Sequence, residues 1–221
     1  MVQAIIFDLD GTVVDSEGLW EEVFSTVARN RQIPNPKPGK WIHEAGVGIL
    51  PNWERLVGKG EKAESLARET WNLYSQETKK EEVRVREGLV ELVEFIKEQG
   101  WLTGLATGSN WNVVEQELEQ LDMYLAFDVT TTGEEVLAQK PDPEIYLLTA
   151  QKMGVAPAEC VVMEDSVAGV TAAIEAGCRV VGITSDYASG EQLRAAGATF
   201  VVDNLRETVV LLREHGNKES N

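Results

Sequence analysis

The strongest constraint on the fold is a repeated pattern in which a short apolar run ends in polar residues. The first run, Val2 to Phe7, stops at Asp8-Leu9-Asp10-Gly11-Thr12, where a glycine and polar side chains break the apolar pattern. The same pattern recurs at Leu102 to Ala106, Cys160 to Met163 and Val180 to Ile183. Each run predicts a buried strand whose carboxyl end leads into a polar loop.

Amphipathic segments separate these runs and predict helices. Several of them end in glycine, as at Gly100 and Gly154, which suits the left-handed residue at a helix C-terminus. Alternating strands and helices predict right-handed crossovers and an α/β fold with a doubly wound, mostly parallel, Rossmann-like sheet. Ligands bind such sheets at the carboxyl ends of the strands. The expected helices span residues 89–99, 113–121, 144–153, 168–176, 192–196 and 205–215.

Residues 15–84 interrupt this alternation. They predict three helices, at 19–30, 53–57 and 63–78, and no strand of any length. A proline-rich stretch at 33–39 separates the first two helices. We therefore expect a small helical cap domain at 15–84, inserted into a core domain formed by residues 1–14 and 85–221.

The composition limits the possible partners. The chain has 37 acidic and 20 basic residues, a formal net charge of −17 that repels nucleic acid and anionic membranes and favours a monomer. No apolar run approaches the roughly 18 residues of a membrane span, and no basic leader precedes Val2. Cys160 and Cys178 lie in apolar surroundings, as expected for small buried side chains in a reducing compartment. The expected location is the cytoplasm.

The carboxylates after the first and third runs predict a metal-assisted reaction. Asp8 and Asp10, one residue apart in a tight turn, repel each other unless a cation compensates. Asp165, with Glu164 beside it, adds oxygen ligands of the kind that Mg²⁺ prefers. With Mg²⁺ polarising a phosphoryl group, Asp8 can act as a nucleophile that forms an aspartyl phosphate. Asp10 can then protonate the leaving alcohol and deprotonate water.

Further residues complete a phosphate site. Thr107 and the backbone N–H groups of Gly108 and Ser109 lie at an expected helix start and can cradle an anion. Asn110 can either bind the substrate or cap that helix. Lys140 supplies a positive charge for the phosphoryl group, which the acidic chain requires locally.

These stretches resemble, in order, the four motifs of the haloacid dehalogenase-like phosphatase superfamily. They are Asp8-Leu9-Asp10-Gly11-Thr12, Thr107, Lys140-Pro141-Asp142-Pro143 and Glu164-Asp165-Ser166. The extended first motif, followed by a helical cap, is similar to the subgroup of β-phosphoglucomutase, phosphoglycolate phosphatase and sugar-phosphate phosphatases. The resemblance implies that Mg²⁺ is held by the Asp8 carboxylate, the backbone carbonyl of Asp10 and Asp165, with Glu164 contacting metal-bound water.

The expected activity is Mg²⁺-dependent hydrolysis of a small phosphate monoester, with a phosphosugar mutase as the alternative. Trp20 occupies the position of a histidine found in related mutases, and the expected specificity loop at 45–52 contains no lysine or arginine. A haloacid dehalogenase would lack Asp10, and an inactive binding module would be expected to have lost at least one of Asp8, Asp10, Lys140 and Asp165, which are all present. The cation-free loop favours a sugar phosphate without a second anionic group, with Trp20 contacting it near the hinge.

Overall fold

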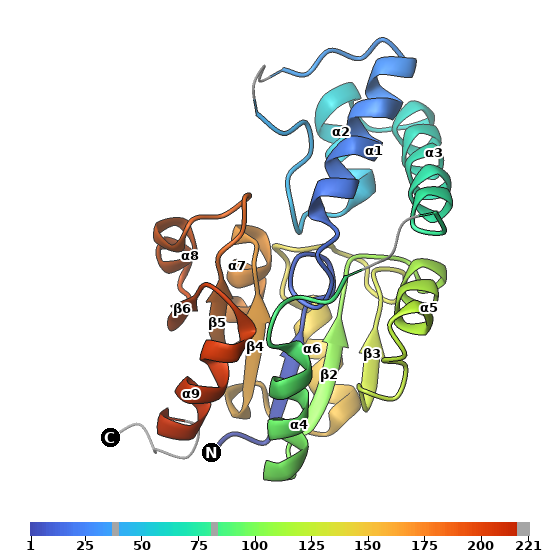
Figure 1. Ribbon diagram of the computed structural model, residues 1–221. Helices are drawn as coiled ribbons and strands as arrows, with labels where there is room; N and C mark the ends of the chain where they lie inside the picture. Colours follow the sequence, from blue (N-terminus) through green and yellow to red (C-terminus); the bar gives the residue numbers. More distant parts are fainter. Residues whose placement is uncertain (37–39, 81–83, 216–221) are drawn as a thin grey trace.

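The computed structural model describes residues 1–36, 40–80 and 84–215, which contain one six-stranded, fully parallel sheet (Figure 1). The strand order is β3-β2-β1-β4-β5-β6, so β1 lies in the middle. This confirms the predicted doubly wound α/β fold. The strands are β1 (Ala4–Phe7), β2 (Leu102–Ala106), β3 (Val129–Thr131), β4 (Cys160–Glu164), β5 (Arg179–Ile183) and β6 (Phe200–Val202).

Helices cover both faces of the sheet because alternate residues of each strand point to opposite sides. Ile5 and Phe7 of β1 pack with α4 and α9, whereas Ala4 and Ile6 pack with α6, α7 and α8. The helices on the first side are α4 (Leu89–Gln99), α5 (Trp111–Gln120) and α9 (Leu205–His215). Those on the second side are α6 (Glu144–Met153), α7 (Val167–Glu175) and α8 (Gly190–Ala196), and a 3₁₀ turn, η1 (Pro157–Glu159), precedes β4.

The predicted bounds of α4, α6 and α9 match the structure, and those of the other core helices differ by one or two residues at the ends. Strands β3 and β6 were not predicted. Each has three residues, forms an edge of the sheet and is only partly buried, so its apolar pattern is too short to be recognised.

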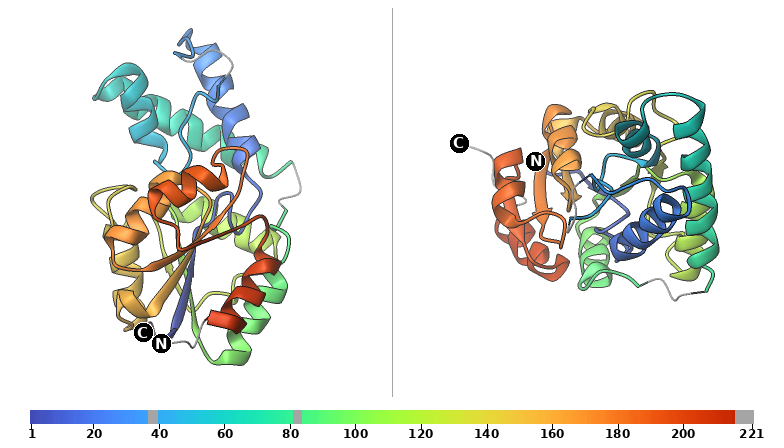
Figure 2. Two further views of the ribbon diagram at one scale, coloured as in Figure 1. Left: turned by 90° about the vertical axis from the view of Figure 1, so that its left-hand side faces the viewer. Right: turned by 90° about the horizontal axis from the view of Figure 1, so that it is seen from above.

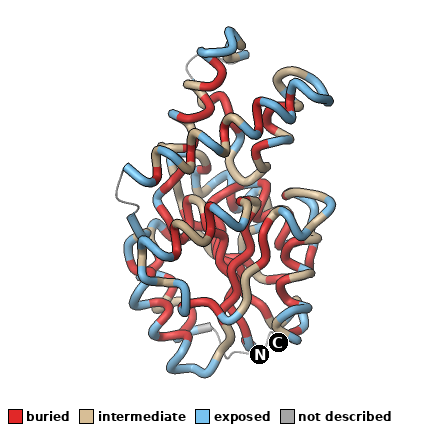
Figure 3. The backbone as a smooth tube through the Cα atoms, turned by 90° about the vertical axis from the view of Figure 1, so that its right-hand side faces the viewer, coloured by how far each residue is buried: buried red, intermediate tan, exposed pale blue. Residues whose placement is uncertain are grey.

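Three helices form a unit of their own above the carboxyl ends of the strands (Figures 1 and 2). They are α1 (Glu17–Asn30), α2 (Ile49–Val57) and α3 (Glu61–Glu77). Their buried side chains, among them Phe24, Trp53 and Tyr74, form a cluster separate from the two clusters that flank the sheet. Figure 3 shows buried segments in both parts of the molecule. Helix α2 begins four residues before the predicted start. Part of the predicted proline-rich stretch, residues 37–39, lies outside the described residues.

The two connections to the α1–α3 unit run side by side just beyond β1. The Asp15 N–H donates to the Arg84 carbonyl at 2.9 Å, and the Arg86 N–H donates to the Val13 carbonyl at 3.0 Å. An antiparallel bridge joins Val14 to Val85 between them. The α1–α3 unit is therefore tied to the sheet at the strand end that carries Asp8. Among the described helices, none is long and apolar enough to cross a membrane.

Candidate active site

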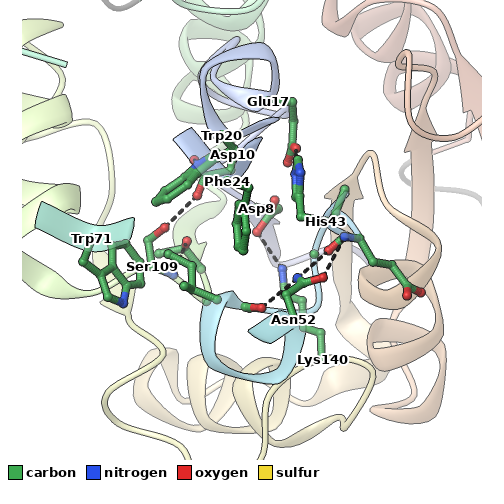
Figure 4. Close-up of a pocket in the computed structure, with 17 residues that line it drawn as sticks. Asp8, Asp10, Glu17, Trp20, Phe24, His43, Asn52, Trp71, Ser109 and Lys140 are labelled. Atoms are coloured by element: carbon green, nitrogen blue, oxygen red, sulfur yellow. Dashed lines mark hydrogen bonds and ion pairs between the residues drawn. The ribbon is translucent and has the colours of Figure 1, made fainter. Parts of the chain in front are cut away.

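A buried lysine joins two carboxylates at the carboxyl ends of β1 and β4. Lys140, in the loop between β3 and α6, places its Nζ 2.6 Å from Asp8 Oδ1 (Figure 4). The same Nζ lies 2.7 Å from Glu164 Oε1. All three side chains are buried. Burial works to lower the pKa of Lys140, but the charges of Asp8 and Glu164 outweigh it and raise this pKa. Lys140 is therefore a fixed positive charge against Asp8.

Glu164 holds this lysine in place. Its Oε1 also accepts a hydrogen bond from the Tyr146 hydroxyl at 2.7 Å, and its Oε2 accepts from the Ser166 N–H and hydroxyl, both at 3.0 Å. Because both oxygens have protein partners, the geometry favours a role for Glu164 as the partner of Lys140 over a role as a direct metal ligand. Its contact with metal-bound water stays a prediction.

Asp165 provides a carboxylate that the protein leaves partly unsatisfied. Its Oδ2 is buried and has no hydrogen-bond partner among the described residues, while its Oδ1 accepts a weak bond of 3.4 Å from the Thr12 hydroxyl. Burial and the charges of Glu17, Glu164 and Asp8 raise the pKa of Asp165. An unpartnered buried carboxylate oxygen is costly unless a proton or a cation satisfies it.

The charges at this end of the sheet fit a divalent cation. Asp8, Glu164 and Asp165 each offer an oxygen, and these atoms lie within 4.8 Å of one another. When all three carboxylates are ionised, the one ammonium that contacts them, that of Lys140, leaves two of their negative charges unbalanced. Burial raises the pKa of Asp8, with Lys140 opposing the shift. A dication that prefers oxygen would offset both charges and favour ionised Asp8.

Gly11 lets Asp165 approach the loop that follows β1. Its φ of +81° lies in the left-handed region, and a Cβ atom there would stand 2.1 Å from Asp165 Oδ2. Any side chain at position 11 would displace this carboxylate. The glycine in the first motif is thus required by close packing as well as by the turn.

The Asp10 carboxylate is held by three donors. Its Oδ1 accepts from the Ser16 hydroxyl at 2.7 Å and from Trp20 Nε1 at 2.6 Å, and its Oδ2 accepts from the Ser109 hydroxyl at 2.7 Å. The structure therefore brings Asp10 together with two of the predicted substrate-binding residues, Trp20 and Ser109. Both line the cavity beside Asp8, but their polar atoms contact Asp10.

The loop after β2 differs in detail from the predicted anion cradle. Thr107, Gly108 and Ser109 line the cavity, but the Ser109 N–H donates to the Thr107 hydroxyl at 3.0 Å. The Asn110 side-chain oxygen accepts from the Val113 N–H at 3.1 Å and caps α5, and the described lining of the cavity does not include Asn110. Of the two roles left open for Asn110, this geometry favours the helix cap.

The α1–α3 unit forms the roof of the cavity, where His43 lies beside Glu17 (Figure 4) and also contacts a second carboxylate. His43 Nδ1 lies 2.9 Å from Glu21 Oε2, and its Nε2 lies 3.3 Å from Glu17 Oε2. Its ring stacks on Phe24, with 4.9 Å between ring centroids. Burial works to lower the pKa of His43, but the hydrogen bonds to both carboxylates outweigh it and raise this pKa. Even with His43 protonated, the two carboxylates leave this cluster with one negative charge.

Asn52 shapes the loop between His43 and α2. Its side-chain nitrogen donates to the carbonyls of Glu44 at 3.0 Å and Gly48 at 2.8 Å, and its oxygen accepts from the Glu44 N–H at 2.8 Å. Glu17, His43 and Asn52 were not predicted as site residues. A signal existed for Glu17, because it precedes Trp20 by three residues and so places a carboxylate on the apolar stripe of α1.

A doubly wound sheet whose central strand ends in a buried lysine–carboxylate cluster defines an α/β enzyme with its site at the strand ends. The chain belongs to the haloacid dehalogenase-like hydrolase family, whose sequence model matches residues 2–177. The motifs quoted from the sequence fall within this match.

Two of the similar proteins carry the name of a phosphatase. The chain is 34% identical over 207 residues to the phosphorylated carbohydrates phosphatase of Thermotoga maritima, covering 91% of this chain and 94% of that protein. It is 31% identical over 202 residues to hexitol phosphatase B of Escherichia coli, covering 86% and 87%. The crystal structure of a hydrolase from Pseudomonas syringae shares the fold, with a TM-score of 0.84, 24% identity and coverage of 96% and 99%.

Proposed function

We propose that this protein is a Mg²⁺-dependent phosphatase that hydrolyses phosphate monoesters of sugars or sugar alcohols through an aspartyl phosphate on Asp8. The observation that carries the proposal is the contact of Asp8 with Lys140 at 2.6 Å, beside the unpartnered buried oxygen of Asp165. This arrangement combines a nucleophile, a fixed cation and an incomplete set of oxygen ligands at one end of the sheet.

The residues proposed to hold Mg²⁺ are Asp8, Asp165 and the backbone carbonyl of Asp10, with Glu164 behind them. The two uncompensated negative charges and the bare Asp165 oxygen support this assignment. When bound, Mg²⁺ would supply the positive charge that draws electrons from the phosphoryl group and eases attack by a carboxylate.

The chain's own residues account for both halves of the reaction. In the first, an oxygen of Asp8 attacks phosphorus, the ester P–O bond breaks, and Asp10 gives its proton to the departing alcohol. In the second, Asp10 takes a proton from water, the water oxygen attacks phosphorus, and the Asp8–phosphorus bond breaks. Phosphate leaves and both aspartates return to their starting states. Lys140 stabilises the negative charge on the transferred group throughout.

The roof of the cavity supports a substrate with neutral hydroxyl groups. Glu17 and Glu44 line it, and the one basic side chain among the described lining residues of the roof, His43, is already shared between two carboxylates. A second anionic group on the substrate would meet net negative charge, whereas hydroxyls can donate hydrogen bonds to carboxylates. The names of the relatives, which act on phosphorylated carbohydrates and a hexitol phosphate, point in the same direction.

The α1–α3 unit is proposed as the cap domain of residues 15–84 over the core domain of 1–14 and 85–221. Its separate apolar cluster and the paired connections at Val14 and Val85 support a unit that can move as a whole against the sheet. Closing the cap would shield the phosphoryl group from bulk water and bring Glu17 and His43 to the substrate.

The test is a panel of phosphate monoesters assayed with Mg²⁺ and after its removal by a chelator. The panel contains hexitol phosphates, sugar phosphates, phosphoglycolate and a nucleoside monophosphate. Asp8→Asn is expected to reduce phosphate release at least about 1,000-fold, because it removes the nucleophile. Acid quenching during turnover, followed by mass spectrometry, is expected to find phosphate attached to Asp8.

The matched control is Asp122→Asn, an aspartate of the core far along the chain from the motifs, whose positive φ of 53° asparagine also tolerates. It is expected to retain wild-type rates. Full activity of Asp8→Asn, or activity that persists after the chelator, would contradict the proposal. Conversion of one sugar phosphate into its isomer without release of phosphate would instead establish the phosphosugar mutase.

A further inference from the structure

The Asp10 carboxylate is oriented by both parts of the molecule. Ser109, in the loop after β2, donates to Oδ2 from the sheet side. Ser16 and Trp20, at and within the start of α1, donate to Oδ1 from the other side. Asp10 itself follows β1. Its carboxylate therefore takes this orientation only while α1 is seated against the strand ends.

The Trp20 indole is fixed so that its N–H must point at Asp10. The ring is 5% exposed and stacks on Tyr74, with 3.5 Å between centroids and 4° between planes. The edge of Trp71 closes another side, with a centroid distance of 5.3 Å and an angle of 86°. Tyr74 is in turn anchored to the core, since its hydroxyl donates to Glu117 on α5 at 2.6 Å.

The chemistry of indole decides what Trp20 can do there. An indole N–H donates a hydrogen bond and cannot accept one, so Trp20 cannot carry a proton between Asp10 and the substrate. At 2.6 Å it can fix the place of the carboxylate that does carry the proton. A general acid has to lie within hydrogen-bond reach of the leaving oxygen, so a carboxylate that rotates freely protonates it less often.

We propose that Trp20 is a positioning residue, whose N–H holds Asp10 in the orientation from which it protonates the leaving alcohol. This role rests on the proposed function, because it needs Asp10 to act as the general acid. It also refines the sequence-based expectation for Trp20: the ring lines the cavity, but its one polar atom serves Asp10 and not the substrate.

The test compares two leaving groups in Trp20→Phe, which keeps an aromatic ring against Tyr74 and removes the N–H. A sugar alcohol leaves poorly without a proton, whereas p-nitrophenol leaves well without one. We expect kcat/KM for a hexitol phosphate to fall about 10- to 100-fold. For p-nitrophenyl phosphate it should fall less than about 3-fold, because that step needs little help from a general acid. The measure is kcat/KM because it reports the steps up to and including cleavage of the ester bond.

Trp53→Phe is the matched control. Its indole is fully buried and donates to the Thr70 hydroxyl at 2.8 Å within the α1–α3 cluster. The same substitution there should lower the melting temperature and leave the ratio of the two kcat/KM values unchanged. Ser109→Ala removes the donor on the opposite oxygen of Asp10 without altering the packing of α1, and should shift the ratio in the same direction as Trp20→Phe.

The outcomes separate this role from the proposed function. If kcat/KM falls equally for both substrates in Trp20→Phe and Ser109→Ala, Trp20 contributes only to packing. If kcat/KM falls for neither substrate, Trp20 has no part in the reaction. Both results overturn the inference alone. Asp10→Asn should change the ratio of the two kcat/KM values even more than Trp20→Phe does. If it does not, Asp10 is not the general acid, and the inference for Trp20 is wrong as well. Phosphate release that persists in Asp8→Asn would overturn the proposed function itself.

Discussion

The sheet side and the roof of the cavity treat buried charge in opposite ways. At the strand ends, Asp8 and Glu164 share one lysine, and an oxygen of a third carboxylate, that of Asp165, has no partner among the described residues. In the roof, Glu17 and Glu21 share His43, and the Asn52 side chain is fully hydrogen-bonded. The sheet side is built to receive further positive charge and a reacting group. The roof is held in shape by its own hydrogen bonds, and in the proposed function it selects the substrate.

The sheet side depends most strongly on Lys140, and removing it should give the largest effect. Lys140→Met leaves Asp8 and Glu164 facing each other without their shared cation, so we expect kcat to fall about 1,000-fold. The free energy of unfolding at pH 7 should fall by about 3–5 kcal/mol, because an unpaired buried charge is costly. Steady-state kinetics and chemical denaturation measure the two effects.

A second substitution separates charge repulsion from catalysis. In Lys140→Met with Glu164→Gln, one of the two opposed carboxylates is neutral, and the new amide side chain still offers an oxygen to Tyr146 or Ser166. This double variant should regain much of the lost stability and remain inactive. Recovery of activity along with stability would show that Lys140 serves only as a structural counterion.

The sheet side and the roof also differ in how far the sequence predicts them. Asp8, Asp10, Lys140, Glu164 and Asp165 follow recognisable patterns, and a parallel sheet brings the carboxyl ends of its strands to one edge whatever the details of the loops. Local sequence patterns were therefore enough to predict which of these residues lie together at the strand ends. The expected roles of these residues remain predictions, because geometry alone does not show a reaction.

The roof could not be predicted in the same way. The contacts of His43 with Glu17 and Glu21 span 26 and 22 residues and depend on how the segment before α2 folds back over α1. Neither this path nor the contact of Trp20 with Asp10 has a local periodic pattern. The contact of Tyr146 with Glu164 was not predicted for another reason. In the sequence, a tyrosine on an amphipathic helix looks like any core aromatic residue, and only the structure shows that its hydroxyl donates to Glu164.

The selective role of the roof predicts a smaller effect from Glu17→Gln. The substitution keeps the shape of the side chain and removes a negative charge from the lining of the cavity. We expect kcat/KM for phosphoglycolate, relative to a hexitol phosphate, to rise about 10-fold, equivalent to about 1.4 kcal/mol. Glu22→Gln removes the same charge from an exposed position on α1 and should leave this ratio unchanged. Equal shifts in both variants would mean that the overall acidic field, and not the roof, repels the second anion.

The smallest expected effect on catalysis belongs to Glu117, which lies where the two regions meet and should act on stability. This carboxyl on α5 is fully buried, accepts a hydrogen bond from Tyr74 of α3, and has no described partner at its Oε2. Burial, followed by the charge of Asp10, raises its pKa well above the ordinary value of 4.5. The folded protein therefore keeps a proton on Glu117 at pH values where the unfolded chain has released it.

The sign of the resulting pH dependence follows from proton binding. Above pH 4.5 the unfolded state binds fewer protons at this site than the folded state, so the contribution of Glu117 to stability falls as the pH rises towards its folded pKa. Glutamine does not titrate. Glu117→Gln should therefore gain stability relative to the wild type between about pH 5 and about pH 8, by up to about 1.4 kcal/mol per pH unit within that window. Denaturation curves at both pH values, with exposed Glu119→Gln as the control, measure this gain. A wild-type-to-variant difference that is the same at both pH values would show that Glu117 is ionised in the folded protein, and that the junction of the two regions carries a charge after all.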